Sequence, residues 1–294
     1  MKKILSFVPG EKVVPKEADC RGRRLDFTRT RVMGVINVTP DSFSDGGRFH
    51  ELSAALEMYT RMSEAGADII DIGGESTRPG SGEVDDTEEL LRVMPILEQI
   101  DMTQGPLVSI DTRKPIVARA ALEAGVHIVN DVSGFGNLEM IRVVAEVGAA
   151  AIVMHMKGEP RMMQEAPVYE NVVREVAEFL EERASAAERG GVGSVWVDPG
   201  IGFGKSWDHN LEILRSFTLF NEMVRPLVIG VSRKTFIGQA TGVQEAEARM
   251  MGSKLTEGFA VLGGADVIRT HDVPEATEVI RMAEVLARGT IKPE

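Results

Sequence analysis

Short apolar runs recur along the whole chain, and each of them carries a polar or charged residue at or near its end. The runs occupy residues 32–37, 67–73, 107–111, 127–131, 149–155, 195–198, 227–232 and 266–271. Between them lie segments with helical periodicity, at 51–65, 87–100, 116–124, 138–147, 170–189, 211–220, 246–263 and 275–287. Strands that alternate with helices predict an α/β fold with a parallel sheet, and eight such units predict a single (β/α)8 TIM barrel.

The chain begins with a segment that does not follow this alternation. Residues 1–30 are mixed in charge and contain Pro9, Gly10 and Pro15. We therefore divide the chain into an N-terminal extension, 1–30, and a barrel, 31–294. We expect the extension to form a hairpin that closes the bottom of the barrel, and we assign it no chemistry.

The polar strand ends indicate an active site. In barrels of this kind the carboxyl ends of all strands lie on one face, where catalytic residues gather. The strand ends here carry Asn37, Asp71, Asp111, Asn130, Asp131, His155, Asp198, Ser232, Arg269 and His271. Three connections rich in Gly, Pro and polar residues, 39–48, 75–86 and 156–169, follow strands and are expected to act as lids.

Composition narrows the classes of partner. A net charge of -12 argues against nucleic acid, which binds clustered Lys and Arg. No apolar stretch approaches the ~18 residues of a membrane span, and the N-terminus lacks a long apolar signal region, so we expect a cytoplasmic protein without a membrane partner. Cys20 is the single cysteine, which excludes a disulfide framework and a CxxC site.

Several strand ends suit a flat heterocycle. Asp111 and Asn130 would bring a carboxylate and an amide together on neighbouring strands, and Asp198 can accept two hydrogen bonds from an N–C–NH2 edge. Met154 offers polarisable cover for an aromatic ring. We interpret Asp131 as structural, and His155 as a hydrogen-bonded spacer rather than a ligand.

Other strand ends suit an anion or a cation. The amide oxygen of Asn37 fits a magnesium ion that keeps most of its waters, although the residues after it also fit a simple turn. Lys234 is compatible with a Schiff base or with a hydrogen-bonding cation. Arg269 and His271, two residues apart on an extended strand, would project the same way as an oxyanion clamp. The glycines of 198–206 match neither phosphate-loop pattern.

Taken together, these stretches resemble the dihydropteroate synthase family of pterin-binding TIM barrels. The matching segments are MGVINVTPDSFSDGG at 33–47, DIGGESTRPG at 71–80, SIDT at 109–112, NDVSG at 130–134, MHMKGEPRMMQ at 154–164, DPGIGFGK at 198–205, SRKTFIG at 232–238 and RTHDV at 269–273. The resemblance spans residues 31–288 and leaves out only the N-terminal extension and the last few residues.

The resemblance implies an enzyme that joins 4-aminobenzoate to the methylene carbon of 6-hydroxymethyl-7,8-dihydropterin diphosphate and releases pyrophosphate. It implies a pterin pocket of Asp111, Asn130, Asp198 and Lys234, with Arg269 stacked near the ring. The pyrophosphate would be bound by Asn37 through Mg2+ and by Thr77, Arg269 and His271. The aminobenzoate would lie against Pro79, Phe203 and Lys234, with its carboxylate near Thr235. Loops with Asp41, Ser42, Phe43, Asp45 and Arg78 would close over both substrates.

The same resemblance implies a homodimer and a catalytic set of Asp45, Asp111, Lys234 and Arg269, and we expect an SN1-like path. Two positions depart from the family pattern: Thr235 stands where Ser is frequent, and Lys157 where Gln is frequent. The alternatives are a methyltetrahydrofolate-binding methyltransferase of the same barrel family, a Schiff-base aldolase that uses Lys234, and a non-catalytic pterin-binding protein. The positions of Thr77, Arg78, Arg269 and His271 argue against the methyltransferase, which needs no diphosphate clamp.

Overall fold

The computed structural model describes residues 17–38, 47–76, 82, 84–158 and 167–288. Eight parallel strands form the sheet of a barrel, in the order β8-β7-β6-β5-β4-β3-β10-β9. They are β3 (Arg31–Asn37), β4 (Ile69–Gly73), β5 (Leu107–Asp111), β6 (Ile128–Asp131), β7 (Ala150–Met154), β8 (Ser194–Asp198), β9 (Val228–Gly230) and β10 (Val267–Thr270). The seam between β8 and β9 is closed by a bridge from Val197 to Leu227.

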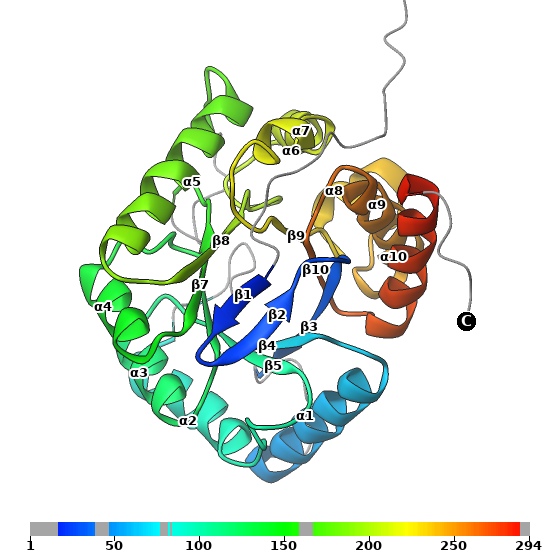
Figure 1. The fold of residues 1–294 in the computed structure, drawn as a ribbon. Helices are drawn as coiled ribbons and strands as arrows, with labels where there is room; N and C mark the ends of the chain where they lie inside the picture. Colours follow the sequence, from blue (N-terminus) through cyan, green and yellow to red (C-terminus); the bar gives the residue numbers. More distant parts are fainter. Residues whose placement is uncertain (1–16, 39–46, 77–81, 83, 159–166, 289–294) are drawn as a thin grey trace, which may run out of the picture.

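Helices surround the strands (Figure 1). They are α1 (Gly47–Glu64), α2 (Asp86–Leu97), α3 (Pro115–Glu123), α4 (Leu138–Val147), α5 (Val172–Arg189), α6 (Trp207–Arg215), α7 (Phe217–Phe220), α8 (Thr235–Thr241), α9 (Met250–Leu262) and α10 (Val273–Arg288). A 3-10 turn, Glu247–Arg249, precedes α9. The prediction of a (β/α)8 TIM barrel is confirmed.

Several helices differ from the prediction; α1, for example, begins at Gly47 and not at residue 51. The segment expected at 211–220 begins earlier, because Ser206 and His209 form a capping box, and it is divided into α6 and α7 at Ser216. The segment expected to begin at 246 starts its α-helix at Met250. The seven-residue helix α8, which ends at left-handed Gly242, was not predicted, because it is too short to show helical periodicity.

Alternation along each strand sorts the apolar side chains into two cores. One set, which includes Val108, Val129 and Val197, packs with residues of the surrounding helices. The other set, which includes Leu107, Ile128 and Trp196, forms a separate buried cluster inside the barrel. Successive strand residues point to opposite faces of a sheet, so each strand contributes to both cores.

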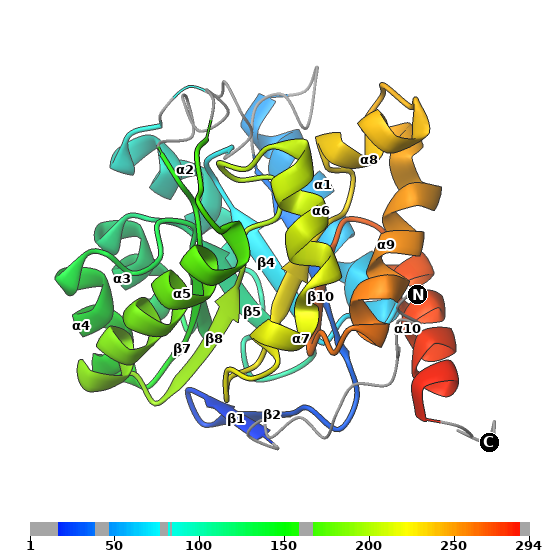
Figure 2. The ribbon, with the colours of Figure 1, turned by 90° about the horizontal axis from the view of Figure 1, so that it is seen from above.

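The N-terminal part of the described chain seals the inner core. β1 (Glu17–Cys20) and β2 (Arg23–Asp26) pair as an antiparallel hairpin, as expected. The hairpin crosses one end of the barrel, opposite the end where α8 lies (Figure 2). Phe27 stands edge-on to Trp196 with ring centroids 5.5 Å apart. Cys20 is fully buried in the same cluster, where burial raises the pKa of its thiol to about 12 and keeps it unreactive.

A buried histidine fastens the start of β6. The Nδ1 atom of His127 accepts a hydrogen bond from the Val108 amide at 3.0 Å, and its Nε2 atom lies 3.1 Å from the Met102 carbonyl oxygen. Burial, with a contribution from the positive charge of Arg23, lowers the pKa of His127 to about 4. The native protein therefore resists protonation that the unfolded chain accepts.

This depressed pKa predicts a loss of stability in acid. Between about pH 6.5 and pH 4 the unfolded state binds a proton that native His127 refuses, so the free energy of unfolding falls as the pH is lowered. The substitution His127→Gln keeps an acceptor and a donor but does not titrate. Urea denaturation should show a pH slope that is shallower in the variant, by at most about 1.4 kcal/mol per pH unit. Identical slopes for the two proteins would contradict this prediction, and pH 8 provides the reference.

Candidate active site

The inner face of the strands changes from apolar to polar toward their carboxyl ends. Beyond Ile69 on β4 comes Asp71, which is completely buried, and beyond Val267 on β10 comes Arg269. Arg269 donates from Nε to Asp71 Oδ2 at 2.7 Å and from Nη2 to Asp111 Oδ2 at 2.7 Å. A single guanidinium thus links two carboxylates from β4 and β5 across the barrel interior.

Asp71 also orients a predicted site residue. Its Oδ2 atom accepts a hydrogen bond of 3.0 Å from the side-chain Nδ2 of Asn130 on β6. The sequence places Asp71 among the polar strand ends without indicating a role for it. Its position two residues after Ile69 was the available signal, since that spacing places it on the inner face. We regard it as a residue that positions Arg269 and Asn130.

Asp111 lies where its ionisation can be adjusted. It is the last residue of β5 and is 8% exposed. Burial raises the pKa of its carboxyl to about 7, and the charge of Arg269 opposes a further rise. A carboxyl with a pKa near neutrality and an adjacent cation is typical of a functional site.

Asp198, Phe203 and Lys234 form the next part of the site. Asp198 ends β8, accepts a hydrogen bond from the Gly200 amide at 2.7 Å, and has its pKa raised by burial. Lys234 Nζ lies 3.9 Å from the centroid of the Phe203 ring and donates to the Ile201 carbonyl at 2.7 Å. Burial lowers the pKa of Lys234 to about 7, against the opposing effect of the Asp198 charge. The three side chains thus offer a carboxylate, an aromatic face and a cation together.

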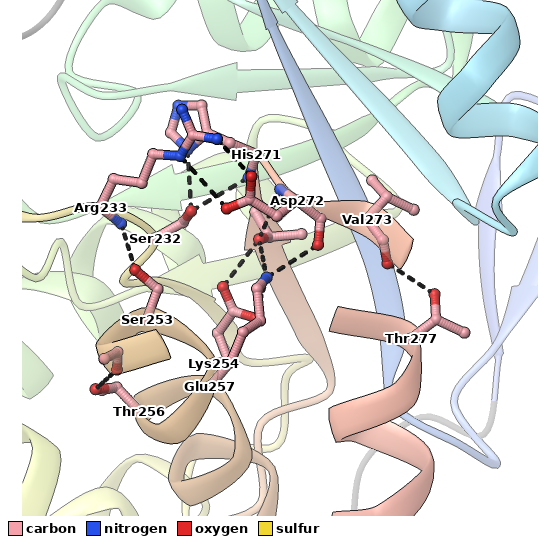
Figure 3. Close-up of polar contacts among 12 residues, drawn as sticks. Ser232, Arg233, Ser253, Lys254, Thr256, Glu257, His271, Asp272, Val273 and Thr277 are labelled. Carbon is pink, nitrogen blue, oxygen red and sulfur yellow. Dashed lines mark hydrogen bonds and ion pairs between the residues drawn. The ribbon is translucent and has the colours of Figure 1, made fainter. Parts of the chain in front are cut away.

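The loops after β9 and β10 are joined to each other (Figure 3). Ser232 Oγ lies 3.0 Å from His271 Nδ1, and Arg233 forms an ion pair with Asp272. Arg233 has a left-handed backbone, with φ of 59°, and its amide donates to Ser253 Oγ on α9 at 2.8 Å. These contacts determine where the chain places Lys234 and His271.

A buried ion pair on the neighbouring helix α9 supports the carboxyl end of β10 (Figure 3). Lys254 Nζ on α9 donates to Glu257 Oε2 at 2.7 Å, to Thr270 Oγ1 at 2.9 Å and to the Asp272 carbonyl at 2.9 Å. Thr270 in turn donates to Glu257 Oε1 at 2.9 Å. Every proton of the Lys254 ammonium therefore has an acceptor.

The remaining predicted residues divide into two groups. Asn37 lies half-buried at the end of β3, Met154 lies buried at the end of β7, and Thr235 is exposed at the start of α8. Asp45, Thr77, Arg78 and Pro79, together with Asp41, Ser42 and Phe43, lie outside the described residues. The structure therefore gathers residues of the predicted pterin side and leaves most of the predicted loop residues untested.

Two polar strand ends belong to the scaffold, as the sequence analysis expected. Asp131 accepts hydrogen bonds from the amides of Ser133, at 2.7 Å, and Phe135, at 2.9 Å, so it closes the turn after β6. His155 Nδ1 lies 2.9 Å from Lys205 Nζ. The ring of His155 stands edge-on to Phe179 of α5 at 4.9 Å, which places it on the helix side of the barrel.

The donor set fits a magnesium ion that is held mainly by a substrate. Across the described parts of the chain, no group of three or more His, Cys, Asp or Glu side chains could hold a metal ion. Asn37 supplies one neutral oxygen at the carboxyl end of β3. Magnesium keeps several waters and commonly combines one or two protein oxygens with phosphate oxygens. This residue set therefore agrees with an ion that is bound together with a diphosphate.

In the part of the chain that the structure describes, every helix is too short or too polar to span a membrane.

Comparison with known proteins gives one consistent family. The model of the pterin binding enzyme family matches residues 33–271. The dihydropteroate synthase of Escherichia coli K12 is 42% identical over 266 residues, which cover 90% of this chain and 94% of that protein.

Solved structures agree. Dihydropteroate synthase of Xanthomonas albilineans with 4-aminobenzoic acid superposes with a TM-score of 0.87 at 40% identity, covering 94% of this chain and 99% of that one. The Thermus thermophilus enzyme in complex with 6HMPPP superposes with a TM-score of 0.79 at 39% identity, covering 92% of this chain and 99% of that one. With this coverage and the inner-face site described above, the chain belongs to the pterin binding enzyme family and, within it, to the dihydropteroate synthases.

Proposed function

We propose that this chain condenses 6-hydroxymethyl-7,8-dihydropterin diphosphate with 4-aminobenzoate, giving 7,8-dihydropteroate and pyrophosphate in folate biosynthesis. The observation that carries this proposal is the convergence of Asp111, Asn130 and Asp198 on the inner face of the barrel, beside Lys234 and Arg269. Related structures contain 4-aminobenzoic acid and 6HMPPP, which supports both substrates.

The pterin is placed against the inner-face residues. Asp198 accepts hydrogen bonds from the N–C–NH2 edge, while Asn130, held by Asp71, offers both a donor and an acceptor. Arg269 lies between Asp71 and Asp111, where its planar guanidinium can stack on a ring. Met154 adds apolar cover at the end of β7.

The other groups are assigned to the diphosphate and to aminobenzoate. Asn37 would hold Mg2+, and the ion supplies charge neutralisation for the leaving pyrophosphate. Arg269 contributes positive charge beside these groups, and we expect His271 and Thr77 to donate hydrogen bonds to the phosphate oxygens. Aminobenzoate lies against Phe203, Lys234 and Pro79, with its carboxylate near Thr235 at the start of α8.

The reaction needs little base catalysis, because an aryl amine is already a nucleophile. Cations that absorb the charge of pyrophosphate favour its departure, and the electron-rich pterin stabilises the positive methylene carbon that remains. Ionised Asp111 stabilises this cationic pterin. We expect Asp45 and Arg78 to complete the site. The path is SN1-like: the carbon–oxygen bond breaks before aminobenzoate attacks.

A pyrophosphate-release assay tests the function directly. The purified chain, with Mg2+ and both substrates, should release pyrophosphate in step with dihydropteroate formation, and chelation of Mg2+ should stop turnover. A sulfonamide should raise KM for aminobenzoate and leave kcat unchanged. No release with any pterin diphosphate and arylamine would refute the proposal. Borohydride trapping of a carbonyl substrate on Lys234 would instead support the aldolase alternative.

The role of Asp111 predicts a specific pH profile. Because its pKa is about 7 and its ionised form is the active one, kcat/KM should rise with pH through about 7. Asp111→Asn should remove this ascending limb and lower kcat by about 100-fold. Binding of pyrophosphate, measured by product inhibition, should weaken much less. Asp208→Asn, an exposed carboxylate on α6, is the matched control. Equal losses in turnover and in pyrophosphate binding would contradict the role of Asp111 in stabilising the cationic pterin.

We also propose a homodimer in the cytoplasm. Two helices, α9 and α10, lie side by side (Figure 1). Both expose large apolar residues at four-residue spacing. On α9 these are Met251 and Leu255, 80% and 77% exposed, and on α10 Met282 and Leu286, 57% and 65% exposed. Residues four apart share one face of a helix, so each of the two helices presents an exposed apolar pair, and exposed apolar area of this kind marks interfaces.

Charge introduced into this surface should separate the subunits. The double variant Met251→Glu/Leu255→Glu should shift the mass measured by light scattering from dimer to monomer at micromolar concentration. Leu138→Glu on α4 replaces an equally exposed apolar residue, 82% exposed, and should leave the mass unchanged. A wild-type chain that is monomeric, or a dimer that both variants retain, would show that α9 and α10 do not form the interface.

A further inference from the structure

The glycine-rich loop after β8 folds around a lysine of its own. Lys205 lies at the end of this loop and is 2% exposed. Its Nζ atom donates to the Gly200 carbonyl at 2.8 Å and to the Phe203 carbonyl at 3.0 Å, and it lies 2.9 Å from His155 Nδ1. An ammonium has three protons, so these acceptors saturate it. Lys205 therefore has no donor left for a phosphate or any other ligand.

The acceptors of Lys205 are neutral, which makes its burial costly. Burial lowers the pKa of Lys205 well below its ordinary value, and Asp198 acts on it only through its field. A buried cation without a paired carboxylate is rare in proteins, because its desolvation must be offset by hydrogen bonds alone. A hydrophobic side chain of the same length would fill this space without that cost. The ammonium therefore stabilises the conformation of the loop rather than the packing of the hydrophobic core.

The loop is seated directly on the chain that follows β7. A Cβ atom on Gly200 would lie 1.9 Å from the His155 carbonyl oxygen, and one on Gly204 would lie 2.1 Å from the Lys157 carbonyl oxygen. Both glycines have positive φ, 64° and 60°. Tyr169 donates to the Gly204 carbonyl at 2.7 Å. Backbone therefore packs directly on backbone here, so the loop can take only one position against the chain that follows β7.

His155 is the third acceptor around Lys205 Nζ, after the Gly200 and Phe203 carbonyls. Burial, with the nearby Lys205 charge, lowers the pKa of His155 to about 3, so the imidazole is neutral at physiological pH. When Lys205 is an ammonium it can only donate, and Nδ1 of His155 is then the acceptor while Nε2 carries the proton. His155 is thereby linked to the site through Lys205, although its ring faces the helices.

Other groups of the same loop contact the site. The Ile201 carbonyl accepts the hydrogen bond from Lys234, and the Phe203 ring lies beneath the Lys234 ammonium. The Gly200 amide donates to Asp198. Two of these residues, Gly200 and Phe203, hold Lys205 with their own carbonyl groups. A shift of the ammonium would therefore move Phe203 and the acceptor of Lys234.

We propose that Lys205 is a positioning residue for the aminobenzoate side of the site. Its ammonium, held by the Gly200 and Phe203 carbonyls and by His155, keeps the loop 199–205 in the shape that places the Phe203 ring and the Ile201 carbonyl against Lys234. The inference rests on the proposed function, because the aminobenzoate assignment does. Lys205 itself touches no substrate and takes no part in bond making.

The first test separates the two substrates kinetically. Lys205→Met keeps the length of the side chain and removes its donors. KM for aminobenzoate should rise by about tenfold or more, as expected for a loss of about 1.4 kcal/mol, while KM for the pterin diphosphate changes by less than about threefold. A merely structural role would lower the active fraction, and thus apparent kcat, with both KM values unchanged. That result, or equal rises in both KM values, would overturn the inference.

A second pair of variants keeps the test decisive if Lys205→Met does not fold. His155→Gln retains an acceptor for the ammonium and should have a KM for aminobenzoate close to that of the wild-type chain. His155→Leu removes the acceptor and should raise this KM alone, as Lys205→Met does. Equal behaviour of the two His155 variants would contradict the proposal.

A double-mutant cycle identifies the route of the effect. If Lys205 acts through the aromatic ring, Lys205→Met should raise KM for aminobenzoate much less in a Phe203→Leu background than in the wild-type background. Additive effects would show that Phe203 is not the element that Lys205 positions. A wild-type chain that releases no pyrophosphate would instead refute the proposed function, so the two failures are distinguishable.

Discussion

Closure of the barrel forces every second strand residue into one shared interior, and the rest of the structure follows from how that interior is filled. Its lower half is apolar and is sealed by the β1–β2 hairpin, with Phe27 against Trp196. Its upper half is polar and lies toward the carboxyl ends of the strands. Charges placed there are removed from water, so they must satisfy one another or a ligand.

Arg269 meets that requirement at the centre. It joins Asp71 and Asp111 at 2.7 Å each, and Asp71 in turn orients Asn130. Burial and these neighbours bring the pKa values of Asp111 and Lys234 to about 7, from opposite directions. A site with an acid and a base so close to neutrality can change its charge when a substrate arrives, because small changes in environment shift the protonation of both groups.

Parts of the fold that touch no substrate hold this site in place. Lys254 and Glu257 on α9 support the end of β10, and Ser253 fixes the left-handed turn at Arg233 that precedes Lys234. Lys205 performs the corresponding task within the loop after β8. Each of these groups is a buried or half-buried polar residue with neighbours from another element, which is how a barrel face made of separate loops becomes rigid.

The sequence alone was sufficient for the barrel, its strands, the family and the identity of the polar strand ends, because alternation and motif spacing are local properties of the chain. It also assigned Asp131 and His155 to the scaffold. The short helix α8 and the roles of Asp71 and Lys205 appeared only in the tertiary structure. Asp71 acquires its role from Arg269, which lies 198 residues later, and Lys205 from His155, 50 residues earlier. Contacts of that separation are set by the closure of the barrel, and no local pattern contains them.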